Sequence, residues 1–203
     1  MQLFHYHLVT SRVREVEARY LAKLGFELVA RYGRVGEEHR AYESGVSWED
    51  LDQAGFTLRL SELERGAVNV VVQPGQWDLP RVDHIGLVLD DDDFAATIAR
   101  AEELTLRVQE HRHRRTFVST GAGYRIEIHP PRDWIEELLE DSALLSLAEL
   151  QLKTDDPQEK AGALAELLDL PLHESSVSVG DTLVRFVGGG PSGRPELHGE
   201  LFV

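Results

Sequence analysis

The sequence predicts an α+β fold built from repeated βαβββ units, in which one strand is followed by a helix and three further strands. Segments with the period-two alternation of strands and segments with the helical spacing of apolar residues follow one another in this order. The order restarts near residue 82 and, more weakly, near residue 147. At 203 residues the chain is long enough for such units to share a sizeable core.

The first unit is expected over residues 1–78. Its first strand, LFHYHLVTS, leads into a helix for which Ser11 is the expected N-cap and Gly25 the C-terminal stop. A strand, a polar stretch of loop or short helix, and two strands around a turn at Gly66 follow. These elements are expected over residues 3–11, 11–26, 27–33, 34–55, 56–63 and 67–74.

The second unit is expected over residues 79–132, and with the first unit it forms a paired domain, 1–132. A connecting amphipathic helix is expected over 133–146. The third unit, 147–203, shows the weakest pattern and ends on the strand LHGELFV. The expected elements of the second and third units lie at 82–90, 92–104, 106–114, 115–123 and 124–131, and at 147–155, 156–170, 175–189 and 197–203.

Composition narrows the possible functions. The chain has no cysteine, so any metal must be held by His, Asp or Glu. The formal net charge of −15 argues against nucleic-acid or anionic-membrane binding, since both reward a basic surface. Neither a signal peptide nor a membrane-spanning segment is expected, and the predicted compartment is the cytoplasm.

Three segments, one in the first unit and two in the second, carry a resemblance to a known superfamily. HYHLVTSRVREVEARYLAKLGFEL and, one repeat later, DHIGLVLDDDDFAATIARAEE with GAGYRIEIHPP resemble the vicinal-oxygen-chelate superfamily, which includes glyoxalase I, extradiol dioxygenases and bleomycin-binding proteins. The resemblance covers residues 3 to about 132 and only faintly 147–203. It implies that two βαβββ modules enclose a half-open β-barrel cavity.

Strand alternation directs three candidate metal ligands toward one interior. His84 lies opposite the apolar face of Ile85, and Glu127 opposite that of Ile126. His5 lies on the polar face of the first strand. Two imidazoles and one carboxylate suit a divalent ion such as Fe, Mn, Zn or Ni. The resemblance implies the same set, because superfamily ligands come from the first and last strands of each unit.

Two alternatives stay open at this site. His7 shares the face of His5 and is the second choice for its place or for substrate binding. The fourth superfamily position falls on Val71, which cannot ligate, although a two-residue slip would bring in Asn69. The cavity could also be free of metal, with its histidines and Glu127 hydrogen-bonded to one another.

The basic segment HRHRR, residues 111–115, is conspicuous in so acidic a chain. Arg112 and Arg115, with Arg125, are candidates to bind an anionic substrate through their guanidinium forks. A charged edge strand explains the same segment equally well. Tyr124 and His129 are weaker candidates for acid–base catalysis.

The function implied by the resemblance is that of a metal-dependent glyoxalase- or dioxygenase-like enzyme acting on a small polar or anionic molecule. The alternatives are a metal-free protein that sequesters a small molecule and a module that binds a partner. The third unit has Glu149 where the strand histidine would be, so we expect it to be structural. Its apolar sheet face favours a homodimer.

Overall fold

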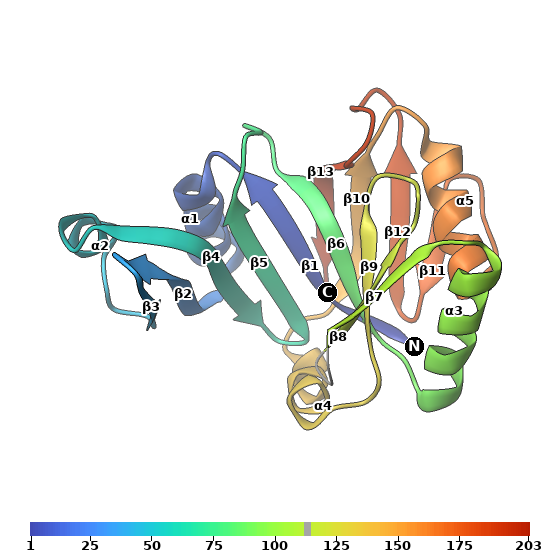
Figure 1. The fold of residues 1–203 in the computed structure, drawn as a ribbon, viewed down its shortest axis with the longest axis horizontal. Helices are drawn as coiled ribbons and strands as arrows, with labels where there is room; N and C mark the ends of the chain where they lie inside the picture. The colour runs from blue at the N-terminus through green and yellow to red at the C-terminus, as the bar shows by residue number, and fades with distance from the viewer. Residues whose placement is uncertain (112–114) are drawn as a thin grey trace.

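The computed structural model describes residues 1–111 and 115–203, whose strands join in one open sheet with helices on its faces (Figure 1). The α+β class predicted from the sequence is confirmed. The strands are β1 Gln2–Thr10, β2 Glu27–Val35, β3 Glu38–Tyr42, β4 Phe56–Arg65, β5 Val68–Pro74, β6 Arg81–Val88, β7 Arg107–His111, β8 Arg115–Ser119, β9 Arg125–His129, β10 Leu147–Lys153, β11 Ser176–Val179, β12 Thr182–Val187 and β13 Glu196–Phe202. The helices are α1 Val13–Leu24, α2 Trp48–Gln53, α3 Asp91–Glu103, α4 Asp133–Glu140 and α5 Pro157–Leu168, with a 3₁₀ turn at Asp141–Ala143.

The first two units share one topology. In the first unit β1 lies parallel to β5, and the order continues through β4 and β2 to the added strand β3. In the second unit β6 lies parallel to β9, and β8 and β7 follow. The units meet where β1 and β6 pair antiparallel. The first strands of the two units therefore lie side by side at the centre of the molecule.

Each of these central strands carries a β-bulge directly before its histidine. Leu3 pairs with Leu87 and His5 with Gly86, so Phe4 is an extra residue in β1. In β6 the extra residue is Asp83, since the pairing steps across it in the same way. A bulge turns its residue out of the strict alternation. Strict alternation would place Phe4 on the face opposite His5, yet Phe4 lines the same cavity as His5.

The last strand corrects one expectation about the third unit. LHGELFV was expected to close that unit, yet β12 takes this place, parallel to β10. β13 pairs antiparallel with β10, as β6 pairs with β1, and touches β6 through Glu196 and Arg81. The bulges recur as well, with Ala148 as the extra residue before Glu149. β13 thus occupies the position of a first strand.

The polar stretch over 34–55, expected as loop or short helix, contains a strand as well as a short helix. It forms the hairpin strand β3 and the short helix α2, whose N-cap Ser47 makes a capping box with Asp50. At the start of α1 the N-cap is Arg12, not Ser11, because the Ser11 hydroxyl bonds Asp78 at 2.8 Å. Gly25 ends α1 in the left-handed conformation, as predicted.

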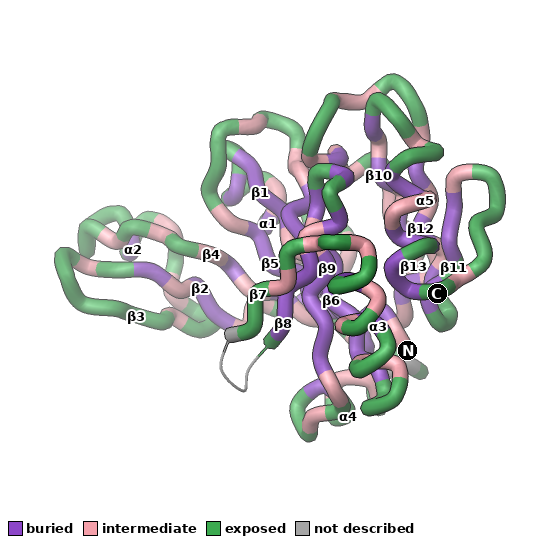
Figure 2. The backbone as a smooth tube through the Cα atoms, turned by 45° about the vertical axis from the view of Figure 1, so that its right-hand side comes forward, coloured by how far each residue is buried: buried purple, intermediate pink, exposed green. Residues whose placement is uncertain are grey.

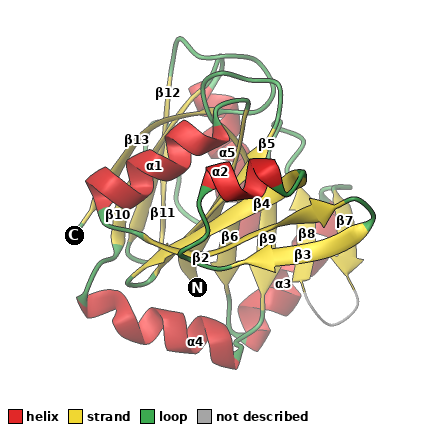
Figure 3. Cartoon of the chain, turned by 90° about the vertical axis from the view of Figure 1, so that its left-hand side faces the viewer, coloured by secondary structure: helices red, strands yellow, loops and turns green. Residues whose placement is uncertain are grey.

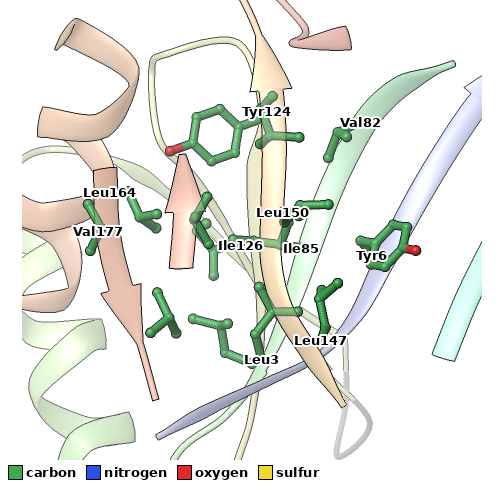
Figure 4. Packing of buried hydrophobic residues seen from close by; sticks show 14 of the residues in the cluster. Leu3, Tyr6, Val82, Ile85, Tyr124, Ile126, Leu147, Leu150, Leu164 and Val177 are labelled. Atoms are coloured by element: carbon green, nitrogen blue, oxygen red, sulfur yellow. The ribbon is translucent and has the colours of Figure 1, made fainter. Parts of the chain in front are cut away.

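One hydrophobic core extends through all three units (Figure 4). Side chains of β1, β6 and β9 pack with those of β10, α5 and β11, among them Tyr6, Ile85, Ile126, Leu150 and Leu164. The buried stretches gather along these central strands (Figure 2). The other face of β1 and β6 is therefore the one left for the cavity.

Helix α4 lies across one end of the strands (Figure 3). Ile135 of α4 packs on Phe4 and Val88 in a small second cluster. Within the described residues, no helix has the length and apolar character needed to cross a membrane.

Candidate metal centre and its cavity

A cavity of about 700 Å³ opens beside the bulged halves of β1 and β6. Strands of both units supply its walls, and α4 contributes Trp134 at one end. Its lining is mixed, with imidazoles, carboxylates, guanidinium groups and aromatic rings. The lining residues are Phe4, His5, His7, Tyr32, Arg59, Leu60, Glu62, Asn69, Val71, Gln73, Asp83, His84, Arg115, Phe117, Arg125, Glu127, His129, Arg132 and Trp134.

The structure brings His5, His84 and Glu127 together at the wall of this cavity. The Nε2 atoms of His5 and His84 lie 3.3 Å apart. The Oε2 atom of Glu127 lies 2.8 Å from Nε2 of His84. All three side chains are buried, and they come from the three central strands β1, β6 and β9. The Nε2 atom of His84 is therefore close to both the His5 imidazole and the Glu127 carboxylate.

Asn69 on β5 orients His5. Its Nδ2 atom donates to Glu62 at 3.0 Å and to Glu64 at 2.7 Å, so its amide oxygen must face the other way. That oxygen lies 2.6 Å from Nδ1 of His5 and can only accept a hydrogen bond. His5 therefore carries its proton on Nδ1 and turns the lone pair of Nε2 toward His84 and Glu127.

The bulge residue Asp83 orients His84. Its Oδ2 atom accepts from Nδ1 of His84 at 2.8 Å, which leaves Nε2 for the cavity side. The same carboxylate is paired with Arg125 and, at 2.5 Å, with Arg194. Burial favours the neutral acid, but the hydrogen bonds from His84 and Arg125 outweigh it and hold the pKa of Asp83 well below its usual range. Asp83 is therefore ionised and accepts the hydrogen bond from Nδ1 of His84.

His129 orients the Glu127 carboxylate through a hydrogen bond. Its Nε2 atom lies 2.9 Å from Oε1 of Glu127 and donates to it, which leaves Oε2 free to face His84. The rings of Phe4 and Trp134 pack edge-on against the His129 ring. Carboxylates, amides and imidazoles that orient metal ligands from behind are the common arrangement of protein metal sites.

The protonation states at the site match what a cation requires. Burial, followed by the nearby His84, lowers the pKa of His5 from 6.5 to about 4. Burial acts against ionisation of Glu127, but the hydrogen bond from His129 and the nearby imidazoles of His84 and His5 prevail, and the pKa of Glu127 lies well below its usual range. At neutral pH the carboxylate is charged and the His5 imidazole is neutral. Ligands in these states need no proton loss to bind a metal.

His7 is a fourth side chain at the site and supplies a third nitrogen. Nitrogen atoms of His5, His7 and His84 all lie within 4.8 Å of one another. The Nε2 atom of His7 is buried and has no hydrogen-bond partner. Burial, with His84 and His5 nearby, lowers the pKa of His7 well below its usual value. The side chain is available either to a metal or to a bound molecule.

The strand register settles which residue takes the fourth position. β1 pairs His5 with Asn69, and β6 pairs His84 with Arg125 in the same parallel arrangement. Two residues further along, Val71 therefore corresponds to Glu127. Val71 lines the cavity with an apolar side chain. Asn69 enters the site through the hydrogen bond that orients His5.

The residues predicted to bind substrate or to act as acid or base do not all line the cavity. Arg115 lines the cavity, with Nη1 3.7 Å from Glu127, while Arg125 is engaged by Asp83. Arg112 lies outside the described residues. Tyr124 lies outside the cavity, because it shares the inner face of Ile126, and its hydroxyl donates to the Lys160 carbonyl at 2.9 Å. Burial raises the pKa of Tyr124, and we give it no catalytic role.

Sequence reasoning missed several residues of the site. Asp83, Trp134 and Arg132 were not candidates, although all three line the cavity. A charged residue inside the apolar run VDHIGLVL was the available signal for Asp83. Nothing in the local pattern marks Arg194, which reaches the site from the loop before β13.

Comparisons with known proteins support the fold. No family model and no curated protein matches the sequence. Similar solved structures include a xylose isomerase-like TIM barrel/4-hydroxyphenylpyruvate dioxygenase fusion protein, with a TM-score of 0.60, 12% identity and coverage of 99% of this chain and 36% of that chain. A mutant 4-hydroxymandelate synthase from Streptomyces coelicolor matches with a TM-score of 0.59 and 15% identity, over 92% of this chain and 62% of that chain. A Mn(II)-bound glyoxalase from Novosphingobium aromaticivorans matches with a TM-score of 0.58 and 12% identity, over 97% of this chain and 63% of that chain. This chain spans less than two thirds of the length of each.

Proposed function

We propose that this chain, which has the vicinal-oxygen-chelate fold, is a metal-dependent enzyme whose divalent ion is held by His5, His84 and Glu127. The observation that carries the proposal is the convergence of three electron-pair donors, each oriented by a buried group behind it. The Nε2 atom of His84 lies 3.3 Å from Nε2 of His5 and 2.8 Å from Oε2 of Glu127, so a cation bound among these atoms would receive an electron pair from each. The residues therefore fit a metal ion.

The ligand set suits Fe, Mn, Zn and Ni alike. A bound ion would act as a Lewis acid and template for two oxygen atoms of a substrate, and iron would also activate dioxygen. The protein's own part is to bind and orient the substrate. Phe117 and Trp134 offer aromatic surfaces at the cavity wall, and these would exclude water from one side of a bound molecule.

Guanidinium groups in the cavity favour a small anionic substrate. Arg59, Arg115 and Arg132 line the cavity. The Nε atom of Arg132 is buried and has no hydrogen-bond partner. Since Arg125 is already paired with Asp83, we assign the anion to Arg115 and Arg132. A carboxylate or phosphate could accept two parallel hydrogen bonds from either fork.

Metal analysis tests the proposed site. Wild type should retain or take up about one equivalent of divalent metal, and Glu127→Gln should lose it because an amide is a poor ligand in place of the carboxylate. Glu149→Gln is the matched control, since Glu149 is a strand carboxylate on β10 that does not line the cavity. If wild type binds none of Fe²⁺, Mn²⁺, Zn²⁺ or Ni²⁺, the enzyme proposal fails. Metal-free binding of a small molecule in the same cavity would then be the better account.

We also propose that two copies of the chain associate through the third unit. Leu144, Leu201 and Val203 are exposed by 71%, 53% and 71%. Val203 pairs with Ser146 through two backbone hydrogen bonds, which brings these apolar side chains into one region. Sedimentation at micromolar concentration should show a dimer that Leu201→Lys weakens. A wild-type monomer would contradict this proposal and leave the metal site untouched.

A further inference from the structure

The loop between β12 and β13 lies against the first residues of β6. The carbonyl of Pro195 accepts a hydrogen bond from the backbone N–H of Val82 at 2.8 Å. The guanidinium of Arg81 donates to the carbonyl of Arg194 at 3.1 Å. Pro195 is buried in this contact. The backbone of Arg194 is thus held beside the strand that carries His84.

The same loop packs closely on the turn between β8 and β9. A Cβ atom at Gly123, where φ is +91°, would lie 2.3 Å from the carbonyl oxygen of Gly193. Only glycine permits this approach and this backbone conformation. The loop is therefore seated on the second unit from two sides, although it belongs to the third unit in sequence.

The Arg194 side chain ends on the carboxylate that orients His84. Its Nη2 atom lies 2.5 Å from Oδ1 of Asp83, while Oδ2 of Asp83 accepts from His84 at 2.8 Å and also meets Arg125. Asp83 is only 4% exposed. Two guanidinium groups, one from each side, therefore determine how this buried carboxylate presents itself to the imidazole.

We propose that Arg194 is a positioning residue of the metal site, through which the third unit holds the Asp83 carboxylate that orients His84. This inference rests on the proposed function, and it gives a role to the third unit. Without Arg194, Oδ1 of Asp83 loses its charged partner and the carboxylate can rotate. His84 would then present Nε2 toward His5 and Glu127 less consistently. Loss of such an outer partner commonly weakens metal binding by 10- to 100-fold.

The test compares Mn²⁺ affinity in wild type, Arg194→Gln and Arg194→Lys. Arg194→Gln should weaken binding by about tenfold, because Arg125 still holds the other oxygen of Asp83. Arg194→Lys should recover part of that loss, since it restores the charge without the fork. Arg185→Gln is the matched control, as it removes an Arg–Glu pair of the same unit whose residues do not line the cavity. Its Mn²⁺ affinity should match wild type.

A second readout does not depend on bound metal. In the metal-free protein, ¹⁵N NMR of the His84 ring should show a protonated Nδ1 that is protected from exchange in wild type and in Arg185→Gln. In Arg194→Gln the protection should fall. An unchanged His84 signal together with unchanged Mn²⁺ affinity would overturn the inference. If wild type binds no metal, the proposed function fails, while the NMR comparison still decides whether Arg194 positions His84.

Discussion

At the scale of single residues, the site depends on which ring nitrogen of each histidine faces the cavity. Asn69 and Asp83 accept hydrogen bonds from Nδ1 of His5 and of His84. His129 donates a hydrogen bond to one oxygen of Glu127. Each partner is itself buried. These hydrogen bonds determine the tautomers of the two histidines and the orientation of Glu127 in the metal-free protein. The three side chains therefore need little reorganisation to bind a cation.

The pKa of His5 predicts that the metal-free protein loses stability in acid. Because burial lowers this pKa from 6.5 to about 4, the unfolded chain binds a proton between these pH values and the folded chain does not. The free energy of unfolding should therefore fall as the pH decreases from about 6.5 toward 4, by at most about 3 kcal/mol for this group. Urea unfolding at several pH values measures it. His5→Gln should depend on pH less steeply than wild type, and equal slopes would contradict the prediction.

At the scale of elements, the paired bulges in β1 and β6 decide what the two central strands present to the cavity. Phe4 and Asp83 occupy equivalent positions of the repeat, each directly before a histidine. The bulges place two consecutive residues of each strand on the cavity side. In β1 the apolar Phe4 precedes His5, and in β6 the carboxylate of Asp83 precedes His84. The same backbone device thus supplies a ring contact in one unit and a hydrogen-bond acceptor in the other.

Gly86 is the residue of β6 that leaves room for the His5 ring. A Cβ atom at Gly86 would lie 2.8 Å from Cβ of His5 and 3.0 Å from its ring. Gly86→Ala should therefore displace His5, destabilise the protein by about 1–3 kcal/mol and weaken Mn²⁺ binding. Urea unfolding and a Mn²⁺ titration measure the two effects.

Gly162→Ala is the control of opposite sign. Gly162 lies inside α5, and a Cβ atom there would meet nothing within 4 Å. Alanine should stabilise the helix by about 0.5–1 kcal/mol without changing metal binding. If Gly86→Ala behaved like Gly162→Ala in both measurements, close packing of His5 against Gly86 would not be a constraint on the site.

At the scale of the whole molecule, several polar contacts join the third unit to the first two, and two of them involve a buried carboxylate. One is the ion pair from Arg194 to Asp83. The other is Glu200 of β13, whose carboxylate accepts hydrogen bonds from Tyr6 and Tyr20 and pairs with Arg19 at 2.6 Å. Together with the shared core, these contacts make the cavity part of a single folded body.

Glu200→Gln should destabilise the whole molecule in one transition. The Glu200 side chain is fully buried, and an amide cannot accept all the hydrogen bonds that its carboxylate accepts. We expect a loss of about 1–3 kcal/mol in the free energy of unfolding, measured by urea unfolding. Glu149→Gln, which removes a pair with the 40%-exposed Arg185, should cost less than about 1 kcal/mol. Equal costs would show that Glu200 contributes no more than a surface pair.

The repeated units and the faces of the central strands could be predicted from the amino-acid sequence. Alternation is a property of each strand's own backbone, so His5, His84 and Glu127 could be assigned to one side from their neighbours alone. The same rule, applied to Tyr124 beside Ile126, already places the tyrosine in the core. The repeat also predicted that the fourth position falls on Val71.

The groups that orient His84, and the place of the last strand, follow from tertiary packing and not from the local sequence. The bulges at Phe4 and Asp83 arise from the pairing of β1 with β6, which lie far apart in the chain. Arg194 meets Asp83 across more than a hundred residues, and β13 chooses β10 as its partner rather than closing its own unit. Register and contacts of this kind come from packing between distant segments, and no local pattern of residues encodes them.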